Sequence, residues 1–83
     1  MNNNLLDKYS LSEILDYKFK KLIENFNTKS NNHNLYEILL NIFEESLLKI
    51  VYEHSENNQK KTAEILGINR NTLKKKLVKY KII

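Results

Sequence analysis

The chain lacks cysteine and proline and contains a single glycine among its 83 residues. Without cysteine, disulfides, thiolate nucleophiles and thiolate metal ligands are excluded. Proline and glycine mark turns and interrupt helices, so their near absence is typical of an almost wholly helical protein. One glycine also excludes the glycine-rich loops that bind nucleotide phosphates. No stretch approaches the ~18 consecutive apolar residues of a membrane span, and residues 1–10 lack the basic and apolar segments of a signal peptide.

What the chain does contain is an uneven distribution of charge. Residues 1–56 hold six Lys and nine acidic residues, whereas residues 57–83 hold seven Lys and Arg70 against Glu64 alone. The net charges of −3 and +7 indicate that the C-terminal part meets a polyanion and that the N-terminal part has another role. A solvated basic tail is the alternative, but apolar residues at helical spacing run through the basic segment.

The chain is long enough for one small domain. Hydrophobic periodicity predicts two helices in its N-terminal part. The first helix spans about residues 11–26 and follows Ser10 and Glu13, which have the spacing of a capping box. A polar segment at 27–33 is predicted to be a loop. Asn34 and Glu37 repeat the capping pattern before a longer helix, about residues 35–55.

The longer helix is apolar around too much of its circumference to be an ordinary surface helix, which buries a band of about 100°. Two further short helices cannot cover this surface in a monomer. A homodimer in which both copies contribute residues 11–55 to a four-helix core would cover it. A monomer with exposed apolar surface is the alternative. The residues predicted to line the dimer core are Leu39, Ile42, Phe43, Leu47 and Val51.

Residues 58–83 have the pattern of a helix-turn-helix, a unit whose second helix can enter the DNA major groove. A short helix at about 59–66 places Ala63 inward, and Gly67 follows its end, where a left-handed backbone is common. Asn69 can cap the next helix, about residues 70–79. On that helix Leu73, Leu77 and Tyr80 share the inner face, and Asn71, Lys74, Lys75 and Val78 share the opposite face.

The polar side chains of this segment are suited to DNA, because phosphates bind cations and neutral donors. The residues predicted to contact the DNA backbone are Asn58, Lys60, Lys61, Thr72, Lys74, Lys75 and Lys76, with Lys79 as a further cation. Arg70 is the only arginine, and arginine pairs bidentately with guanine in the major groove. Its presence in a lysine-rich chain implies that lysine would not serve there. Asn69 is the second candidate for a base contact, although capping alone also explains it.

Catalysis and metal binding find little support in the sequence. His33 and His54 are far apart, and neither has a ligand-type residue four positions on, as a helical metal site would need. The acidic pair Glu44 and Glu45 reads as ordinary solvated helix surface. We therefore expect no enzyme activity and no cofactor. Membrane binding by the basic helix is not expected either, because its few large apolar groups are needed inside.

Residues 35–80 resemble the Fis (factor for inversion stimulation) family of bacterial nucleoid-associated proteins. The resemblance is carried by Asn58-Gln59, Ala63, Gly67-Ile68-Asn69-Arg70, Thr72-Leu73, Lys75-Lys76-Leu77 and Lys79-Tyr80, with Leu35-Tyr36-Glu37 and Leu47-Leu48 upstream. The same type of domain ends the enhancer-binding activators that work with the alternative sigma factor, where a receiver and an ATPase precede it. Because the chain starts with Met and nothing precedes the dimerisation helices, we expect a free-standing protein.

The resemblance implies an all-α fold with four helices per subunit, in which residues 1–83 form one Fis-like domain. It implies a homodimer whose two DNA-binding helices lie closer together than one DNA turn, so that the DNA must bend and an AT-rich centre favours binding. Arg70 would read a guanine in each half-site, Asn69 would assist at a base, and the residues predicted to contact the backbone would hold the phosphates. Ser46, Asn71 and Val78 depart from the family pattern, which has Pro, Gly and Lys at these positions.

The expected function is therefore a nucleoid-associated transcription regulator in the bacterial cytoplasm. Its expected partners are double-stranded DNA and a second copy of the chain, with RNA polymerase as a candidate third. No membrane partner is expected. The competing interpretation is a protein-interaction module whose basic helix docks an acidic partner, and salt-sensitive binding to random duplex DNA would separate the two.

Overall fold

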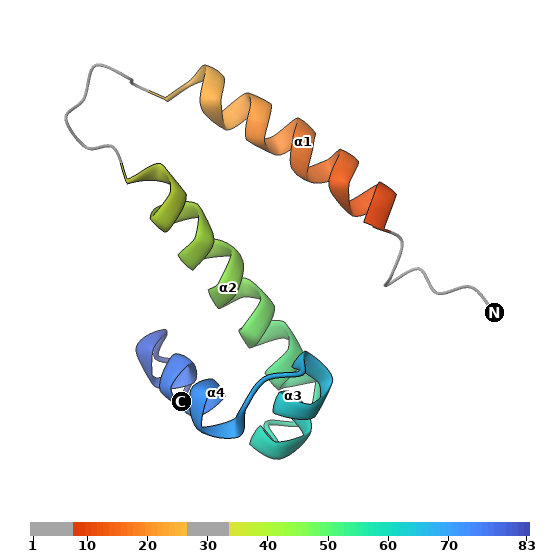
Figure 1. The fold of residues 1–83 in the computed structure, drawn as a ribbon, viewed down its shortest axis with the longest axis vertical. Coiled ribbons are helices and arrows are strands. Elements are labelled where there is room, and N and C mark those ends of the chain that lie inside the picture. The colour runs from red at the N-terminus through yellow and green to blue at the C-terminus, as the bar shows by residue number, and fades with distance from the viewer. Residues whose placement is uncertain (1–7, 27–33) are drawn as a thin grey trace. The chain divides into compact units, whose positions relative to one another are not determined.

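A computed structural model describes residues 8–26 and 34–83 of the chain. These residues form four helices and no strand: α1 (Lys8–Glu24), α2 (Leu35–His54), α3 (Gln59–Leu66) and α4 (Arg70–Lys79) (Figure 1). They belong to two compact units, Met1–His33 and Asn34–Ile83. The all-α prediction is confirmed, and α3 and α4 have the predicted limits. The predicted loop at 27–33 lies outside the described residues.

The helix of the first unit, α1, begins earlier than predicted. It starts at Lys8, so Ser10 lies within the helix and the predicted capping box of Ser10 and Glu13 is wrong. Lysine and tyrosine are tolerated in helices, so Lys8 and Tyr9 can belong to the helix ahead of the predicted cap at Ser10. After the helix ends at Glu24, the Asn25 side-chain amide donates a hydrogen bond to the Lys21 carbonyl at 3.1 Å.

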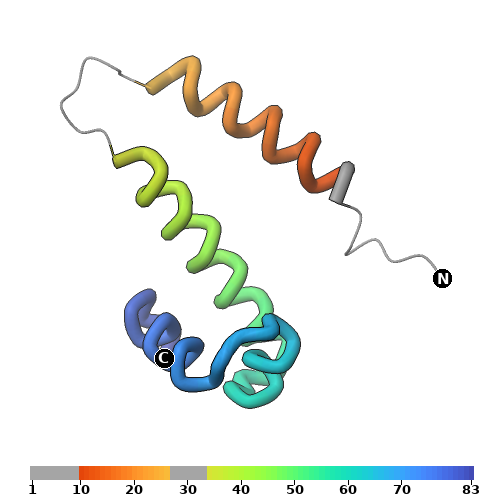
Figure 2. The backbone as a smooth tube through the Cα atoms, viewed as in Figure 1, coloured from red at the N-terminus to blue at the C-terminus, as the bar shows by residue number. Residues whose placement is uncertain are grey.

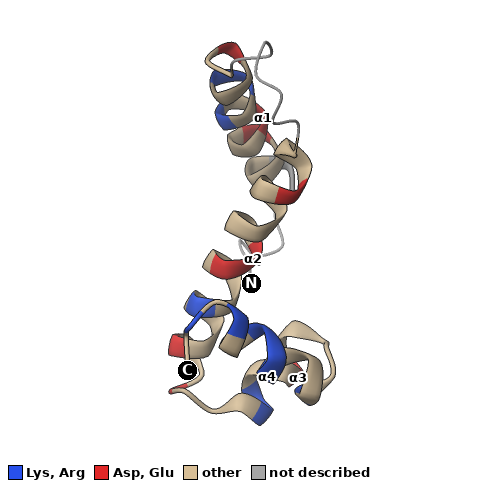
Figure 3. Ribbon diagram, turned by 90° about the vertical axis from the view of Figure 1, so that its left-hand side faces the viewer, with Lys and Arg blue, Asp and Glu red and all other residues tan. Residues whose placement is uncertain are grey.

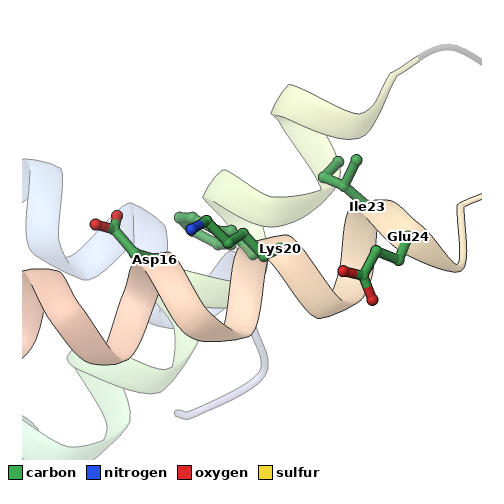
Figure 4. A pocket seen from close by; sticks show the side chains of 5 residues that line it. Asp16, Lys20, Ile23 and Glu24 are labelled. Carbon is green, nitrogen blue, oxygen red and sulfur yellow. The ribbon is translucent and has the colours of Figure 1, made fainter.

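An open hollow runs along α1 and is lined by Asp16, Phe19, Lys20, Ile23 and Glu24. Figure 4 shows the four labelled side chains, Asp16, Lys20, Ile23 and Glu24, rising from the same helix. Residues three and four apart are neighbours on a helix surface, so such hollows form between adjacent side chains. Because all the lining residues belong to one helix, this hollow is not an enclosed binding site.

The second unit begins with α2, whose first residue is Leu35 as predicted. Asn34 occupies the N-cap position, as predicted. Its side chain makes no capping hydrogen bond, so the predicted capping interaction is wrong. Its backbone, at φ −112° and ψ 38°, explains the difference, since capping side chains normally accompany an extended backbone. The Asn34 carbonyl still accepts the Ile38 N–H at 3.0 Å.

The chain turns between α2 and α3 within a few residues. Ser55 is the C-cap of α2, and Glu56 and Asn57 take positive φ angles of 57° and 61°. Asn58 then caps α3 from an extended backbone, with its Oδ1 accepting the Lys61 N–H at 3.0 Å. The predicted break at 56–58 is therefore confirmed, and α3 and α4 gather at the C-terminal end of α2 (Figure 2).

The turn between α3 and α4 depends on Gly67 and Asn69. Gly67 has a φ of 72°, and its N–H donates to the Ala63 carbonyl at 2.8 Å. A residue with a Cβ would be strained in this left-handed conformation, which glycine adopts freely. Asn69 is extended, and its Oδ1 accepts the N–H groups of Asn71 and Thr72 at 2.7 and 3.3 Å. Both predicted caps are thus confirmed.

The core of the second unit is small and lies where the three helices meet. It consists of Leu48 from α2, Ala63 from α3, and Leu73 and Leu77 from α4, the last two with no exposed surface. Partly buried Tyr52, Leu66, Ile68, Tyr80 and Ile82 pack around it. The prediction that Leu73, Leu77 and Tyr80 share the inner face of α4 is therefore confirmed.

A polar junction joins the C-terminal half of α4 to α2 beside this core. The Lys76 ammonium lies 2.8 Å from one Glu44 carboxylate oxygen, and the Tyr80 hydroxyl donates to the other at 2.5 Å. Asn41 Oδ1 lies 3.2 Å from the Tyr80 hydroxyl and accepts a hydrogen bond from Lys79 Nζ at 3.3 Å. The hydrogen bonds from Lys76 and Tyr80 lower the pKa of Glu44, and the bond to Glu44 raises the pKa of Tyr80 to about 12.

The lowered pKa of Glu44 predicts a specific dependence of stability on acid. A carboxyl whose pKa is lower in the folded than in the unfolded chain stabilises the fold above its unfolded pKa. This contribution is lost as the pH falls from about 4.5, the ordinary value, through the folded pKa. Glu44→Gln should therefore lower the free energy of unfolding by about 0.5–1 kcal/mol at pH 7, with a smaller deficit at pH 3.

Urea denaturation of the wild type and of Glu44→Gln, at the same protein concentration and at several pH values from 7 to 3, measures this difference in the free energy of unfolding. Glu53→Gln is the matched control, because Glu53 is an exposed carboxylate on the same helix. It should follow the wild type at every pH. A constant gap between Glu44→Gln and the wild type from pH 7 to pH 3 would contradict the assigned role of the Glu44 carboxylate.

Candidate nucleic-acid interface

α4 carries five Lys and Arg residues and no Asp or Glu, the largest excess of basic over acidic residues among the described helices (Figure 3). Its outer face is the side opposite the buried Leu73 and Leu77. Burial of Leu73 and Leu77 directs the residues on the opposite side of the helix outward. These are Asn71, Lys74, Lys75 and Val78, which together line an open hollow. α4 therefore presents cations, an amide and one apolar side chain on a convex helical surface, which suits a groove in a polyanion.

Arg70 is the first residue of α4 and is exposed. In the part of the chain that the structure describes, its guanidinium has no ion pair or hydrogen bond. The Asn69 cap fixes the backbone of the first turn, so the arginine projects from a defined helix end. A free guanidinium at that position has all of its donors available for a bidentate contact.

The lysines of α4 fall into two groups, which the predicted set of backbone contacts did not separate. Lys74 and Lys75 are exposed on the outer face, next to Asn71. Lys76 is held by Glu44, and Lys79 donates to Asn41, so both point toward α2. Of the lysines in α4 predicted to contact the DNA backbone, the structure thus brings Lys74 and Lys75 together and separates Lys76 from them.

The remaining residues predicted to contact the backbone lie at the starts of α3 and α4. Lys60 and Lys61 are exposed in the first turn of α3, behind the Asn58 cap. Asn58 is exposed as well, and its Oδ1 is already bonded to the Lys61 N–H. Thr72 is exposed in the first turn of α4. The positive end of the helix dipole at each of these helix starts favours nearby phosphates.

Sequence reasoning missed the contacts that Glu44 makes and treated it as solvated surface. Tyr80 follows it by 36 positions and lies on another part of the chain, so no local spacing rule connects them. Sequence reasoning also left Asn71 unassigned, although its spacing from Lys74, Lys75 and Val78 placed it on the outer face. In the structure, the Oδ1 of Asn69, the predicted second base reader, accepts hydrogen bonds from two backbone N–H groups.

The residues predicted to line a dimer core all lie on α2. Ile42, Phe43 and Leu47 are exposed, with 60%, 49% and 42% of their surface accessible. Leu39 and Val51 are half-buried. Further exposed apolar residues on α2 are Tyr36, Ile38, Leu40 and Ile50. α2 therefore carries an apolar surface that α3 and α4 do not cover.

Other kinds of site are absent from the described residues. Within residues 8–26 and 34–83, no group of three or more His, Asp or Glu could hold a metal ion. His54 is exposed near the end of α2, and His33 lies outside the described residues. None of the helices described is both long enough and apolar enough to cross a membrane.

Comparison with known proteins agrees with this geometry. The family model for bacterial regulatory proteins of the Fis family matches residues 40–80, which include α3 and α4. The chain is 42% identical over 73 residues to the DNA-binding protein Fis of Buchnera aphidicola subsp. Acyrthosiphon pisum (strain APS), a match that covers 88% of this chain and 74% of that protein.

Shorter matches involve other DNA-binding proteins Fis. The one from Buchnera aphidicola subsp. Schizaphis graminum is 49% identical over 47 residues, covering 57% of this chain and 48% of that protein. The one from Aliivibrio fischeri (strain MJ11) is 48% identical over 48 residues, covering 58% and 49%. The matched family consists of regulatory proteins rather than enzymes, as expected from the sequence. From the family match and the similarity over most of a Fis protein, the chain belongs to the Fis family of bacterial regulatory proteins.

Proposed function

We propose that the chain is a DNA-binding and DNA-bending homodimer that acts as a nucleoid-associated transcription regulator in the bacterial cytoplasm. The observation that carries the proposal is that Arg70, at the start of α4, and Lys74 and Lys75, on its outer face, are exposed and have no intramolecular partner among the described residues. The relatives named DNA-binding protein Fis support the same conclusion.

In this proposal α4 enters the major groove with its outer face toward the bases and phosphates. Arg70 pairs bidentately with the O6 and N7 atoms of a guanine. Lys74 and Lys75 neutralise phosphates beside the groove, and Lys60 and Lys61 at the start of α3 reach the adjacent backbone. Asn58 and Thr72 add neutral donors. Lys76 is the weakest of the proposed contacts, because DNA binding would compete with its ion pair to Glu44.

The exposed apolar surface of α2 supports the proposed homodimer. Residues 1–83 would form one Fis-like domain, in which residues 11–55 make the dimer core and residues 58–83 bind DNA. The family resemblance supports bending, because two α4 helices spaced more closely than a DNA turn fit only a curved duplex. RNA polymerase is a proposed further partner on the basis of family membership.

The first prediction concerns salt. Each neutralised phosphate contributes about −0.9 to the slope of log K against log salt concentration. Two subunits with several lysines engaged should give a slope on the order of −5 to −10 on an AT-rich duplex, measured by fluorescence anisotropy. A circular-permutation assay on the same site should show bending. A slope near zero would favour a basic helix that docks an acidic protein.

The neighbouring lysines 75 and 76 provide the matched control. Lys75→Gln should make the slope shallower by roughly two, one phosphate per subunit. Lys76→Gln should change it less, because Lys76 is already neutralised by Glu44. Equal changes for the two variants would contradict the division of the α4 lysines into free and paired groups.

The second prediction concerns Arg70. Arg70→Ala should cost about 1–3 kcal/mol per half-site and flatten the preference for guanine at one position. Arg70→Lys should lose nearly as much preference while keeping the charge, since lysine has no bidentate fork. Lys75→Ala should instead weaken binding on every sequence with base preference unchanged. Selection of bound sequences measures all three, and an unchanged guanine preference with Ala at position 70 would remove Arg70 as a base reader.

The third prediction concerns assembly. Sedimentation should show a dimer, twice the 9.9 kDa chain mass, at micromolar concentration. Ile42→Asp should dissociate or unfold it by placing an unpaired charge in the apolar surface. Asn57→Asp is the control, because it adds the same charge at an exposed turn residue whose positive φ aspartate tolerates. A 9.9 kDa species for the wild type throughout the micromolar range would rule out the proposed dimer.

A further inference from the structure

A tight turn ends α4 and places one lysine in an unusual backbone conformation. The Lys81 N–H donates to the Val78 carbonyl at 3.0 Å. The Ile82 N–H donates to the Leu77 carbonyl at 2.8 Å. These two bonds form a Schellman motif, in which the residue just past the helix end takes a left-handed backbone. That residue is Lys81, with a φ of 58°. Ile82 packs against the core that contains Leu77, so the turn is held in place.

Lysine is an unfavourable residue for this conformation. A left-handed backbone brings the Cβ close to the following carbonyl oxygen, and glycine avoids that strain because it has no Cβ. The turn after α3 holds the single glycine of the chain, Gly67, at a φ of 72°. Asparagine also tolerates the conformation, and Asn57 has it at a φ of 61°. Lys81 therefore carries a conformational cost that glycine or asparagine would reduce.

No contact within the described part of the chain compensates for this cost. The Lys81 side chain is exposed, and within residues 8–26 and 34–83 it has no ion pair or hydrogen bond. A cation near the C-terminal end of a helix is favourable, but Lys76 and Lys79 already supply that charge in the last turn of α4. Both of those lysines are bonded to side chains of α2. The ammonium of Lys81 is free, so its use is directed outside the subunit.

Lys81 lies at the C-terminal end of the outer face of α4. Val78, whose carbonyl accepts the Lys81 N–H, lines the open hollow of that face with Lys74 and Lys75. Helix carbonyls point along the axis toward the C-terminus, so the Lys81 backbone follows Val78 in that direction. The rise from Lys75 to Lys81 is on the order of 10 Å, at about 1.5 Å per residue. Phosphates of one DNA strand advance about 3.4 Å along the axis, so the two lysines would meet different phosphates.

The chemistry of Lys81 suits a phosphate. In helix-turn-helix complexes the first residues of the recognition helix contact base edges, and the C-terminal end of such a helix can contact the backbone. A phosphate contact needs a point charge on a flexible stem, which lysine supplies, and it needs no planar fork. The apolar Val78 interrupts the cations of the outer face, and Lys81 continues them beyond it.

We infer that Lys81 binds a phosphate of the DNA backbone at the C-terminal end of α4, and that the chain keeps lysine in this left-handed turn for DNA binding at the expense of stability. The inference rests on the proposed DNA-binding function of α4. It adds one backbone contact per subunit, from a residue that lies beyond the last helix.

The first test uses the opposite effects expected of one substitution. Lys81→Gly removes both the strain and the cation. It should raise the midpoint of urea denaturation, because glycine adopts the left-handed backbone freely. The same variant should bind DNA more weakly. A residue that served only the fold would not give a more stable protein with weaker binding.

The second test measures the dependence of binding on salt by fluorescence anisotropy on an AT-rich duplex. For Lys81→Gly the slope of log K against log salt concentration should be shallower by roughly two, one phosphate per subunit. The affinity advantage of the wild type should therefore shrink roughly tenfold between about 50 and 200 mM salt. Lys81→Arg keeps the cation and should keep the wild-type slope. Lys49→Gln is the charge control, because Lys49 is an exposed lysine of α2 and glutamine is equally favourable in a helix.

Wild-type affinity and slope in Lys81→Gly would overturn the inference, as would an equal change of slope in Lys49→Gln. An unchanged or lower urea midpoint in Lys81→Gly would remove the conformational cost and overturn it as well. Base preference, measured by selection of bound sequences, should be the same in every variant, since phosphate contacts carry no sequence information. Failure of the wild type to bind any duplex would instead remove the proposed function, and the inference with it.

Discussion

The burial of two leucines on α4 sets the direction of every other side chain on that helix. Leu73 and Leu77 have no exposed surface, and together with Leu48 and Ala63 they fix the rotation of α4 about its axis. Rotation by one residue would carry Lys74 into the core, where an unpaired ammonium is strongly unfavourable. The orientation of the basic face therefore follows from apolar packing, and the charges themselves do not determine it.

Glu44 adds a second constraint to the same helix. One carboxylate holds both Lys76 and Tyr80, and so ties the C-terminal half of α4 to α2. The N-terminal half, with Arg70 and Asn71, is held by the Asn69 cap and by the turn at Gly67. In the proposed complex, α4 thus has a free basic half-surface for DNA and a paired one for its own attachment.

The limits of α3 and α4 could be predicted because their signals are local. Asn58, Gly67 and Asn69 satisfy backbone groups within four residues of themselves, so the order of residue types was sufficient. The capping patterns at Ser10 and Asn34 were less reliable. Ser10 lies inside α1, and the backbone of Asn34 is not extended as a capping residue normally is. The role of Glu44 could not be predicted, because its partners approach it only after the chain folds. The DNA contacts and the dimer core remain predictions.

The small core of the second unit has a consequence for how the protein responds to its own abundance. Leu48 of α2 belongs to that core, while the exposed apolar side chains of the same helix form the proposed dimer surface. In such a dimer α2 is shared between folding and association, and mass action makes the stability of the subunit rise with protein concentration. Dilute chains would spend more time unfolded and exposed to proteases. The amount of functional dimer would then rise more steeply than in proportion to the rate of synthesis.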